Sequence, residues 1–181
     1  MRRLLAQLAL HCGLWGASLL AQAAPFEDTM AQRSLACTGC HGPQGRSGPD
    51  GYYPRLAGKP AGYLYNQLVN LQQGRRNYPL MQNLLAPLDD SYLRRLADYF
   101  ANLAIAYPAP APQPSDSALL NRGQQLVRYG DAALQIPACV QCHGVALTGT
   151  EPSVPGLLGL PRDYLNAQMG SWQNGQRQAQ A

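Results

Sequence analysis

Histidine and cysteine are scarce in this chain and occur in few places. The 181 residues include five cysteines and three histidines, and beyond the first 23 residues all of them fall in two motifs, Cys37–His41 and Cys139–His143. No cysteine or histidine is therefore left over as a nucleophile or general base, and the carboxylates are scattered along the chain. The sequence thus offers no catalytic cluster.

The chain also lacks a concentration of charge of either sign. Only 13% of its residues are charged, and lysine and arginine form no stripe. Removing Arg2 and Arg3 with the N-terminal segment described next lowers the formal net charge from +4 to +2. Because nucleic-acid-binding domains carry a clustered basic surface, we expect no nucleic-acid partner.

A long apolar run occurs once, between Leu4 and Leu20. It follows two arginines and precedes an A-x-A pattern at 21–23, so residues 1–23 are typical of a cleavable secretory signal peptide. A membrane-spanning helix is the alternative, although the run is short and interrupted. No later stretch approaches the ~18 apolar residues that a membrane helix requires. We therefore expect an exported chain whose mature part has no transmembrane segment.

Both motifs read Cys-x-x-Cys-His, the attachment signature of c-type haem. Sulfur atoms at this spacing form thioethers with the two vinyl groups of the haem, and the histidine that follows is placed to bind the iron. The usual separation between the cysteine pairs of a zinc site is about 15–20 residues, whereas 98 residues separate Cys40 from Cys139. Two disulfides would leave both histidines unexplained, and a thioredoxin-like pair would need flanking strands. We therefore expect two covalently bound haem c groups.

The chain repeats itself with a period of about 101 residues. The residues that recur are Tyr63, Leu64, Gln67, Gly74 and Arg76, which return as Tyr164, Leu165, Gln168, Gly175 and Arg177. The proline-rich stretch YPAPAPQPS favours an extended spacer between the copies. The period is too long for a solenoid. It indicates two fused copies of one domain, at 24–107 and 116–181, joined by a linker at 108–115.

Helical patterns dominate both copies, and no convincing strand pattern occurs, so the expected fold class is all-α. In the first copy we expect helices at about 27–36, 63–73 and 90–106, with Gly74 ending the second and Asp89 or Asp90 capping the third. The segment that contains Met81 is expected to be a loop. In the second copy a helix at 119–129 precedes the motif, and the last helix of the first copy has no counterpart in the sequence.

Several stretches, taken in order, resemble the two-haem c-type cytochromes of the bacterial periplasm, in which two class I cytochrome c domains are fused. The first copy carries CTGCHG, YPRLAGKPAGYLYNQL, GRRNYPLM and LAPLDDSYLRRLADYFANL, and the second carries IPACVQCHG, PGLLGLPRDYLNAQM and GQR. The resemblance covers residues 24–181. It implies two tandem class I cytochrome c domains, of which the second lacks its C-terminal helix as written.

The resemblance also implies roles for individual residues. These are covalent haem attachment by Cys37, Cys40, Cys139 and Cys142, proximal iron ligation by His41 and His143, distal ligation of the first iron by Met81, and carbonyl oxygens of Pro54 and Pro155 that accept the histidine ring N–H groups. The residues support Met81 separately, because no mature histidine is free and Met81 lies between two expected helices. Met169 aligns with Leu68, and we expect it to fill the core.

Other residues leave questions open. The position that corresponds to Met81 in the second copy would be residue 182, so either the sequence is truncated at Ala181 or the second site is naturally open. The sixth ligand of the second haem is therefore not assigned. Arg76 and Arg177 match across the repeat and are candidates to pair with haem propionates. Arg75 is a weaker candidate, which we expect to lie on solvated surface.

The expected function is the transfer of single electrons between redox partners in the periplasm, because Met/His ligation raises the reduction potential and suits a carrier rather than an oxygen activator. An alternative is a haem-bearing subunit of a periplasmic dehydrogenase complex, of the flavocytochrome or alcohol dehydrogenase type. A haem enzyme or gas sensor at an open second site is a third reading. The expected partners are a membrane cytochrome complex, a terminal oxidase or a dehydrogenase, and peripheral membrane association is compatible with the sequence.

Overall fold

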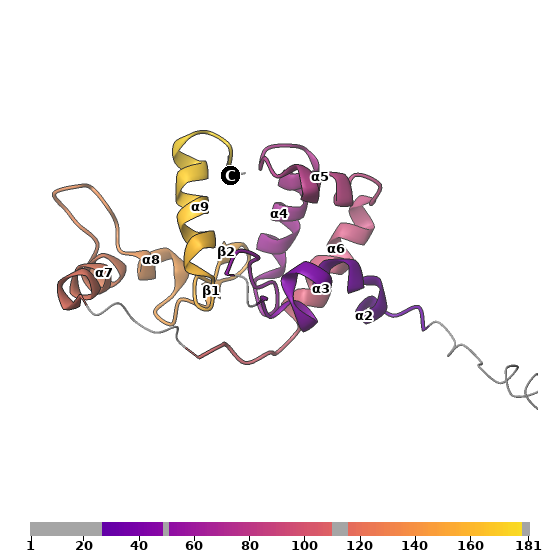
Figure 1. Ribbon diagram of the computed structural model, residues 1–181, viewed down its shortest axis with the longest axis horizontal. Helices are drawn as coiled ribbons and strands as arrows, with labels where there is room; N and C mark the ends of the chain where they lie inside the picture. Colours follow the sequence, from indigo (N-terminus) through magenta and orange to yellow (C-terminus); the bar gives the residue numbers. More distant parts are fainter. Residues whose placement is uncertain (1–26, 49–50, 110–115, 179–181) are drawn as a thin grey trace, which may run out of the picture.

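Two groups of helices follow one another along the chain in the computed structural model, which describes residues 27–48, 51–109 and 116–178. The first group runs from α2 to α6 and the second from α7 to α9, with an extended segment after α6 between them (Figure 1). The expected signal peptide and residues 110–115 of the expected linker lie outside the described residues. Within the described residues, no helix combines the length and the apolar character that crossing a membrane would require.

The described residues of the first domain form five α-helices and one short turn of 3-10 helix. These are α2 (Met30–Arg33), α3 (Leu35–His41), η2 (Pro43–Gly45), α4 (Ala61–Gln72), α5 (Pro79–Leu85) and α6 (Asp90–Ala101). The single helix expected at 27–36 is therefore wrong: two helices meet at Ser34, and the second continues through the attachment motif. The loop expected around Met81 is also wrong, because Pro79 begins a helix there with its backbone already at a helical φ.

The last helix of the first domain confirms its expected start but is shorter than expected. The Asp89 side chain caps it by accepting a hydrogen bond from the backbone N–H of Tyr92, at 2.7 Å. The helix ends at Ala101 instead of about 106. Asn102 turns the chain out of the helix there, and its side-chain amide donates to the carbonyl of Asp98 at 2.8 Å.

The core of the first domain lies where α4 packs against α6 and α5. One cluster contains Leu64, Leu96, Ala97 and Phe100, and a second contains Leu71, Leu85 and Leu93. Leu68 of α4 packs against both clusters. Burial of these side chains stabilises the domain by roughly 1.5–3 kcal/mol for each large residue. The α4 helix is thus held on one side by its own domain.

The second domain repeats this plan in part. It contains α7 (Ser117–Tyr129), α8 (Cys139–His143), a two-stranded hairpin of β1 (Gly149–Thr150) and β2 (Val154–Pro155), and α9 (Arg162–Gln173). Both ends of α9 lie 101 residues after those of α4, so the sequence period is a structural repeat. The hairpin was not predicted, since two residues per strand are too few for an alternating pattern. The fold class is nevertheless all-α, as expected, because helices make up nearly all the regular structure of the described residues.

The two repeated helices meet across the domain boundary, and α9 stands beside α4 in Figure 1. At one end of α4, a Cβ atom placed on Gly62 would come within 2.5 Å of the carbonyl oxygen of Pro152, which follows β1 in the second domain. At the other end, Arg76 pairs with Arg177 in an antiparallel backbone bridge. The adjacent amide of Asn77 donates to the carbonyl of Gln176 at 2.8 Å. The domains are therefore joined by backbone contacts at both ends of the helix pair.

Replacing Gly62 by alanine is expected to loosen the contact between the domains. A contact of 2.5 Å between a Cβ atom and a backbone oxygen cannot persist, so the hairpin must move away from α4. The stability of the α4 helix itself should increase, because alanine favours the helical conformation over glycine by about 1 kcal/mol. We expect faster amide hydrogen exchange in residues 149–156 and unchanged protection within α4. Gly170→Ala is the control, because no atom lies within 4 Å of a Cβ placed there. Unchanged exchange in both variants would contradict this interface.

Candidate haem sites

Each attachment motif lies on a short helix that ends at its histidine. In the first domain, the side chain of Cys37 is partly buried against the Leu64 cluster, and burial raises the pKa of its thiol. Cys40 and Cys142 are exposed, and none of the four cysteines is joined in a disulfide. All four sulfur atoms are therefore available for thioethers, which the alternative of two disulfides would not allow.

The two motif histidines make the same hydrogen bond in the two domains. The Nδ1 atom of His41 lies 2.8 Å from the carbonyl oxygen of Pro54, and Nδ1 of His143 lies 2.6 Å from the carbonyl oxygen of Pro155. A carbonyl can only accept, so Nδ1 carries the proton and donates, which leaves the Nε2 lone pair for a metal. A hydrogen bond of this kind fixes the ring orientation of a metal-binding histidine.

Glycine allows the chain to turn sharply after each histidine. Gly42 and Gly144 have φ values of 76° and 78°, in the left-handed region that favours glycine. A Cβ atom on Gly42 would also lie 2.4 Å from the carbonyl oxygen of Ser47. The turn brings the chain back to the proline carbonyl after 13 residues in the first domain and 12 in the second. The histidine and its acceptor are thus placed by the same backbone geometry, with one residue fewer in the second copy.

Met81 lies on α5, and its partly buried side chain packs against the Leu71 cluster. Met169 differs: its side chain is 62% exposed, so the expectation that it fills the core is wrong. The reason is visible in the first domain, where Leu68, the counterpart of Met169, is covered by α6. The described part of the second domain contains no helix in that position over α9. The repeat predicted the position of Met169 on its helix correctly, but the helix that would cover it is not among the described residues.

Arg75 is less solvated than the sequence suggested. Its Nη2 atom is buried without a hydrogen-bond acceptor, and its Nε atom donates to the side-chain oxygen of buried Asn70 at 2.7 Å. A buried guanidinium nitrogen without a partner is costly, so such a group is normally matched by an anion or a strong acceptor. The orphaned nitrogen fits a site that receives a carboxylate, such as a haem propionate, from outside the polypeptide.

A pair of arginines, Arg76 and Arg177, lies between the domains and has approximate two-fold symmetry. Arg76 donates to the Tyr164 hydroxyl at 2.8 Å and to the Gln168 side-chain oxygen at 3.0 Å. Arg177, which is 9% exposed, donates to the Gln67 side-chain oxygen at 3.1 Å and to the Tyr63 hydroxyl at 3.4 Å. No carboxylate pairs with either guanidinium among the described residues. The two arginines therefore place two positive charges in the interface between the domains. They are the arginines that occupy equivalent positions in the two copies of the sequence repeat.

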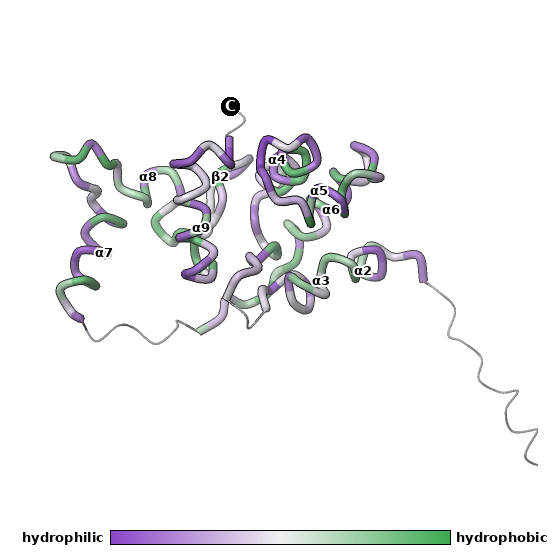
Figure 2. The backbone as a smooth tube through the Cα atoms, turned by 45° about the horizontal axis from the view of Figure 1, so that its top comes forward, coloured by the Kyte–Doolittle hydropathy of each residue, from purple (hydrophilic) through white to green (hydrophobic). Residues whose placement is uncertain are grey.

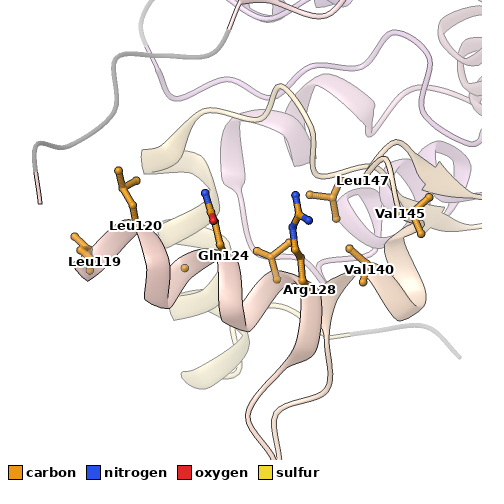
Figure 3. Close-up of a pocket in the computed structure, with 9 residues that line it drawn as sticks. Leu119, Leu120, Gln124, Arg128, Val140, Val145 and Leu147 are labelled. Atoms are coloured by element: carbon orange, nitrogen blue, oxygen red, sulfur yellow. The ribbon is translucent and has the colours of Figure 1, made fainter. Parts of the chain in front are cut away.

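A pocket of about 630 Å³, lined by both apolar and polar side chains, opens beside the second motif. Leu119, Leu120, Gln124 and Arg128 face it from α7, and Val140, Val145 and Leu147 close it from α8 and the loop that follows (Figure 3). Apolar and polar residues alternate along α7, which stands at the edge of the molecule (Figure 2). In the first domain, Met30 of α2 packs against the core cluster that α6 helps to form. Across residues 116–178, no counterpart of α6 packs against α7.

The geometry does not favour the zinc alternative. Nowhere in the described ranges do three side chains of histidine, cysteine, aspartate or glutamate gather as metal ligands. Each motif instead combines two thiols that form no disulfide with a histidine whose Nδ1 is bound to a proline carbonyl. Arg75, Arg76 and Arg177 add cations that pair with no carboxylate among the described residues. This donor set fits covalently attached haem, with its iron and its two propionates.

Comparison with known proteins agrees with this fit. No family model matches the chain. The chain is 37% identical to the thiosulfate dehydrogenase electron acceptor of Thiomonas intermedia, over 98% of this chain and 78% of the relative. It is 33% identical to cytochrome c4 of Pseudomonas aeruginosa, over 98% of this chain and 84% of the relative.

Solved structures extend the comparison to the fold. Reduced recombinant cytochrome c4 from Pseudomonas stutzeri matches with a TM-score of 0.71 and 29% identity, over 86% of this chain and 84% of that one. The thiosulfate dehydrogenase TsdBA from Marichromatium purpuratum matches with a TM-score of 0.71 and 32% identity over 82% of this chain. The match covers 34% of the TsdBA chain, so this chain corresponds to about a third of that protein.

Proposed function

Because the chain belongs to the di-haem class I cytochromes, the family of cytochrome c4, we propose that it carries single electrons in the periplasm from a dehydrogenase to a downstream acceptor. The family relationship makes the chain an electron-transfer cytochrome with two covalently bound haem c groups, and not itself an enzyme. The periplasmic location rests on the signal-peptide pattern of residues 1–23, which lie outside the described residues.

The observation that carries the proposal is the repeated pair of histidine and proline carbonyl. When bound, each haem supplies a one-electron ferric–ferrous couple. In the proposed arrangement, Cys37 and Cys40 hold one haem and Cys139 and Cys142 the other. His41 and His143 bind the irons, and the carbonyls of Pro54 and Pro155 keep their rings in one tautomer and one orientation. An imidazole ring held in one orientation limits the structural reorganisation of the site when the iron changes its oxidation state.

We further propose that Met81 is the distal ligand in the first domain. Its place on α5 supports this role, because α5 is anchored by buried Leu85 and by two hydrogen bonds that Gln72 donates to the carbonyls of Leu85 and Leu88. A methionine on an anchored helix can hold a constant position through repeated redox cycles. Met/His ligation raises the reduction potential of a c-type haem, which suits an electron acceptor.

The arginines are proposed to receive the propionates. Arg75 offers an orphaned buried nitrogen, and Arg76 and Arg177 offer two uncompensated charges between the domains. Charges buried without partners are strongly unfavourable, so bound carboxylates would stabilise this interface. Electrons could then enter through one domain and leave through the other without separation of the two.

The proposed electron donor is a thiosulfate dehydrogenase. Two similar proteins, from Thiomonas intermedia and Stutzerimonas stutzeri, are named as electron acceptors of that enzyme, at 37% and 36% identity. A cytochrome subunit of sulfide dehydrogenase from Chlorobaculum tepidum is 31% identical over 39% of this chain, which makes a sulfide dehydrogenase the second candidate. The first candidate is favoured because its relatives match nearly the whole chain.

The donor can be identified by the rate at which each enzyme reduces the oxidised protein. Full-length holoprotein is mixed in a stopped-flow instrument with thiosulfate dehydrogenase and thiosulfate, and separately with a flavin-containing sulfide dehydrogenase and sulfide. We expect rapid reduction of haem by the first pair, and no reduction by thiosulfate when the enzyme is omitted. Faster reduction by the second pair would replace the proposed donor. Reduction by neither enzyme would contradict the assignment to dehydrogenase-linked electron transfer.

A further inference from the structure

Lys59 is a buried cation of the first domain that reaches into the second. Its side chain is 4% exposed, and its Nζ atom donates a hydrogen bond to the carbonyl oxygen of Gly156 at 2.6 Å. We propose that Lys59 is a positioning residue through which the first domain sets the orientation of His143 and the reduction potential of the second haem. This inference rests on the proposed function in so far as it takes His143 as an iron ligand.

The contact lies one residue away from the carbonyl that holds His143. Pro155 accepts the hydrogen bond from Nδ1 of His143, and Gly156 accepts the one from Lys59. The backbone around Gly156 has no free space, because a Cβ atom there would lie 2.3 Å from the carbonyl oxygen of Thr148. A shift of Gly156 must therefore be passed to the neighbouring Pro155 carbonyl, and from there to the ring of His143.

Among the described residues, no carboxylate forms an ion pair with the ammonium group of Lys59. Burial and the nearby Arg55 lower its pKa to about 8, with burial the larger cause. In the second domain, Glu151 of the hairpin loop is exposed, and Arg162 and Asp163 at the start of α9 are exposed and paired with each other at 3.5 Å. Lys59 thus carries its charge at neutral pH and is partly titrated near pH 8.

A fixed positive charge near a haem favours the reduced iron, because the ferric form carries one more positive charge. Protonated Lys59 should therefore raise the potential of the second haem. As the pH rises through about 8 the charge is lost, and the potential of that haem should fall. Reduction of the haem should in turn make Lys59 hold its proton more tightly, since the two charges interact reciprocally.

Lys59 has no charged counterpart in the second copy. In the second copy, Leu160 stands at the position of Lys59, so the second domain offers no equivalent cation to the first. Gly156 itself stands at the position of Arg55. The Arg55 side chain is buried in its own domain, where it donates to the carbonyls of Ala57 at 2.9 Å and Ala106 at 3.1 Å. The proximal loop of the first haem is therefore supported from within, and that of the second from the neighbouring domain.

Two variants of the full-length holoprotein test the proposal by spectroelectrochemical titration between pH 6 and 10, with each couple assigned from variants that hold one haem. In Lys59→Met, we expect the electron-sharing equilibrium between the haems to shift about tenfold away from the second, equivalent to about 59 mV for a one-electron couple. The fall in potential around pH 8 should disappear. In Lys59→Arg, the second potential should keep its neutral-pH value up to pH 10, because arginine does not titrate there.

A structural readout accompanies the potentials. The amides of Leu157 and Leu158, which donate to the carbonyl of Leu147 at 2.8 and 2.9 Å, should exchange faster in Lys59→Met and at the native rate in Lys59→Arg. Arg95→Met removes an exposed charge from α6 and should change neither readout. An unchanged second potential with an unchanged pH profile in Lys59→Met would overturn the proposal. An electrode supplies the electrons in this titration, so its result does not depend on the proposed electron donor. If the dehydrogenase fails to reduce the protein, the proposed donor is contradicted but the test of Lys59 is unaffected.

Discussion

A variant in which Cys139 and Cys142 are both serine is expected to hold one haem instead of two. Serine cannot form a thioether with a vinyl group, so the second haem loses its covalent attachment. The first motif lies in a separate helix on a separate core, formed by α4, α5 and α6. It should therefore keep its haem. Mass spectrometry of the intact chain would show the loss of one haem mass, and haem absorbance per chain should fall by half.

A matched control lies within the same motif. Gln141 is exposed and lies between the two cysteines, so Gln141→Ser should keep both haems. A double serine variant that still carried two covalent haems would contradict the assignment of these cysteines. Loss of both haems from a folded chain would contradict the independence of the two sites. The reciprocal variant, with serine at Cys37 and Cys40, supplies the second single-haem reference.

Replacing Met81 by alanine should open one coordination position on the first iron. We expect the ferric protein to lose the absorption band typical of methionine–iron bonding, and the ferrous first haem to bind carbon monoxide. Its reduction potential should fall by a sizeable part of the ~0.8 V range over which axial ligands set haem potentials. Absorption spectra and a redox titration measure these effects. The potential of the second haem should change little, because α5 lies in the first domain.

Met169→Ala is the comparison for this variant. The Met169 side chain is 62% exposed, so its removal should change neither the spectrum nor either potential. An unaltered spectrum in Met81→Ala would show that another group completes the first iron site. A changed spectrum in Met169→Ala would show that the exposed methionine binds an iron. It would then be a candidate for the distal ligand of the second haem, to which no described residue has been assigned.

The repeated features of the fold were predictable from the sequence. The 101-residue period predicted that α4 and α9 are equivalent, and their ends differ by that interval. The pairing of His41 with Pro54 and of His143 with Pro155 followed from the family resemblance, and the distances agree with the expected contact. Local signals of this kind depend on a few residues at fixed spacing, which a sequence displays directly.

Features that depend on contacts between distant segments were not predictable in the same way. Arg75 was expected on the surface because arginine usually is, whereas the fold buries one of its nitrogens beside Asn70. Lys59 was not singled out, since its partner Gly156 lies 97 residues away in the other domain. The available signal was the repeat itself: Lys59 is a charged residue whose counterpart, Leu160, is apolar. Such a mismatch marks a position where the two copies have different neighbours.

The helix boundaries also divide into those that a single residue determines and those that depend on packing. Asp89 was recognised as a cap because a single residue determines that feature. The break at Ser34 and the helix at Pro79–Leu85 depend on packing, since Leu85 is buried between α4 and α6 in the folded chain. Pro79 favours a helix start locally, and the burial of Leu85 stabilises the helix that follows.

A coulometric redox titration of the intact, full-length protein, combined with its measured mass, tests the central claim most directly. The claim is that one chain holds two covalent haems and exchanges one electron at each. We expect a mass increased by two haems and the reversible uptake of two electrons per chain in two one-electron steps. A chain with two haems that reversibly accepts fewer than two electrons, or a chain with one haem, would contradict it.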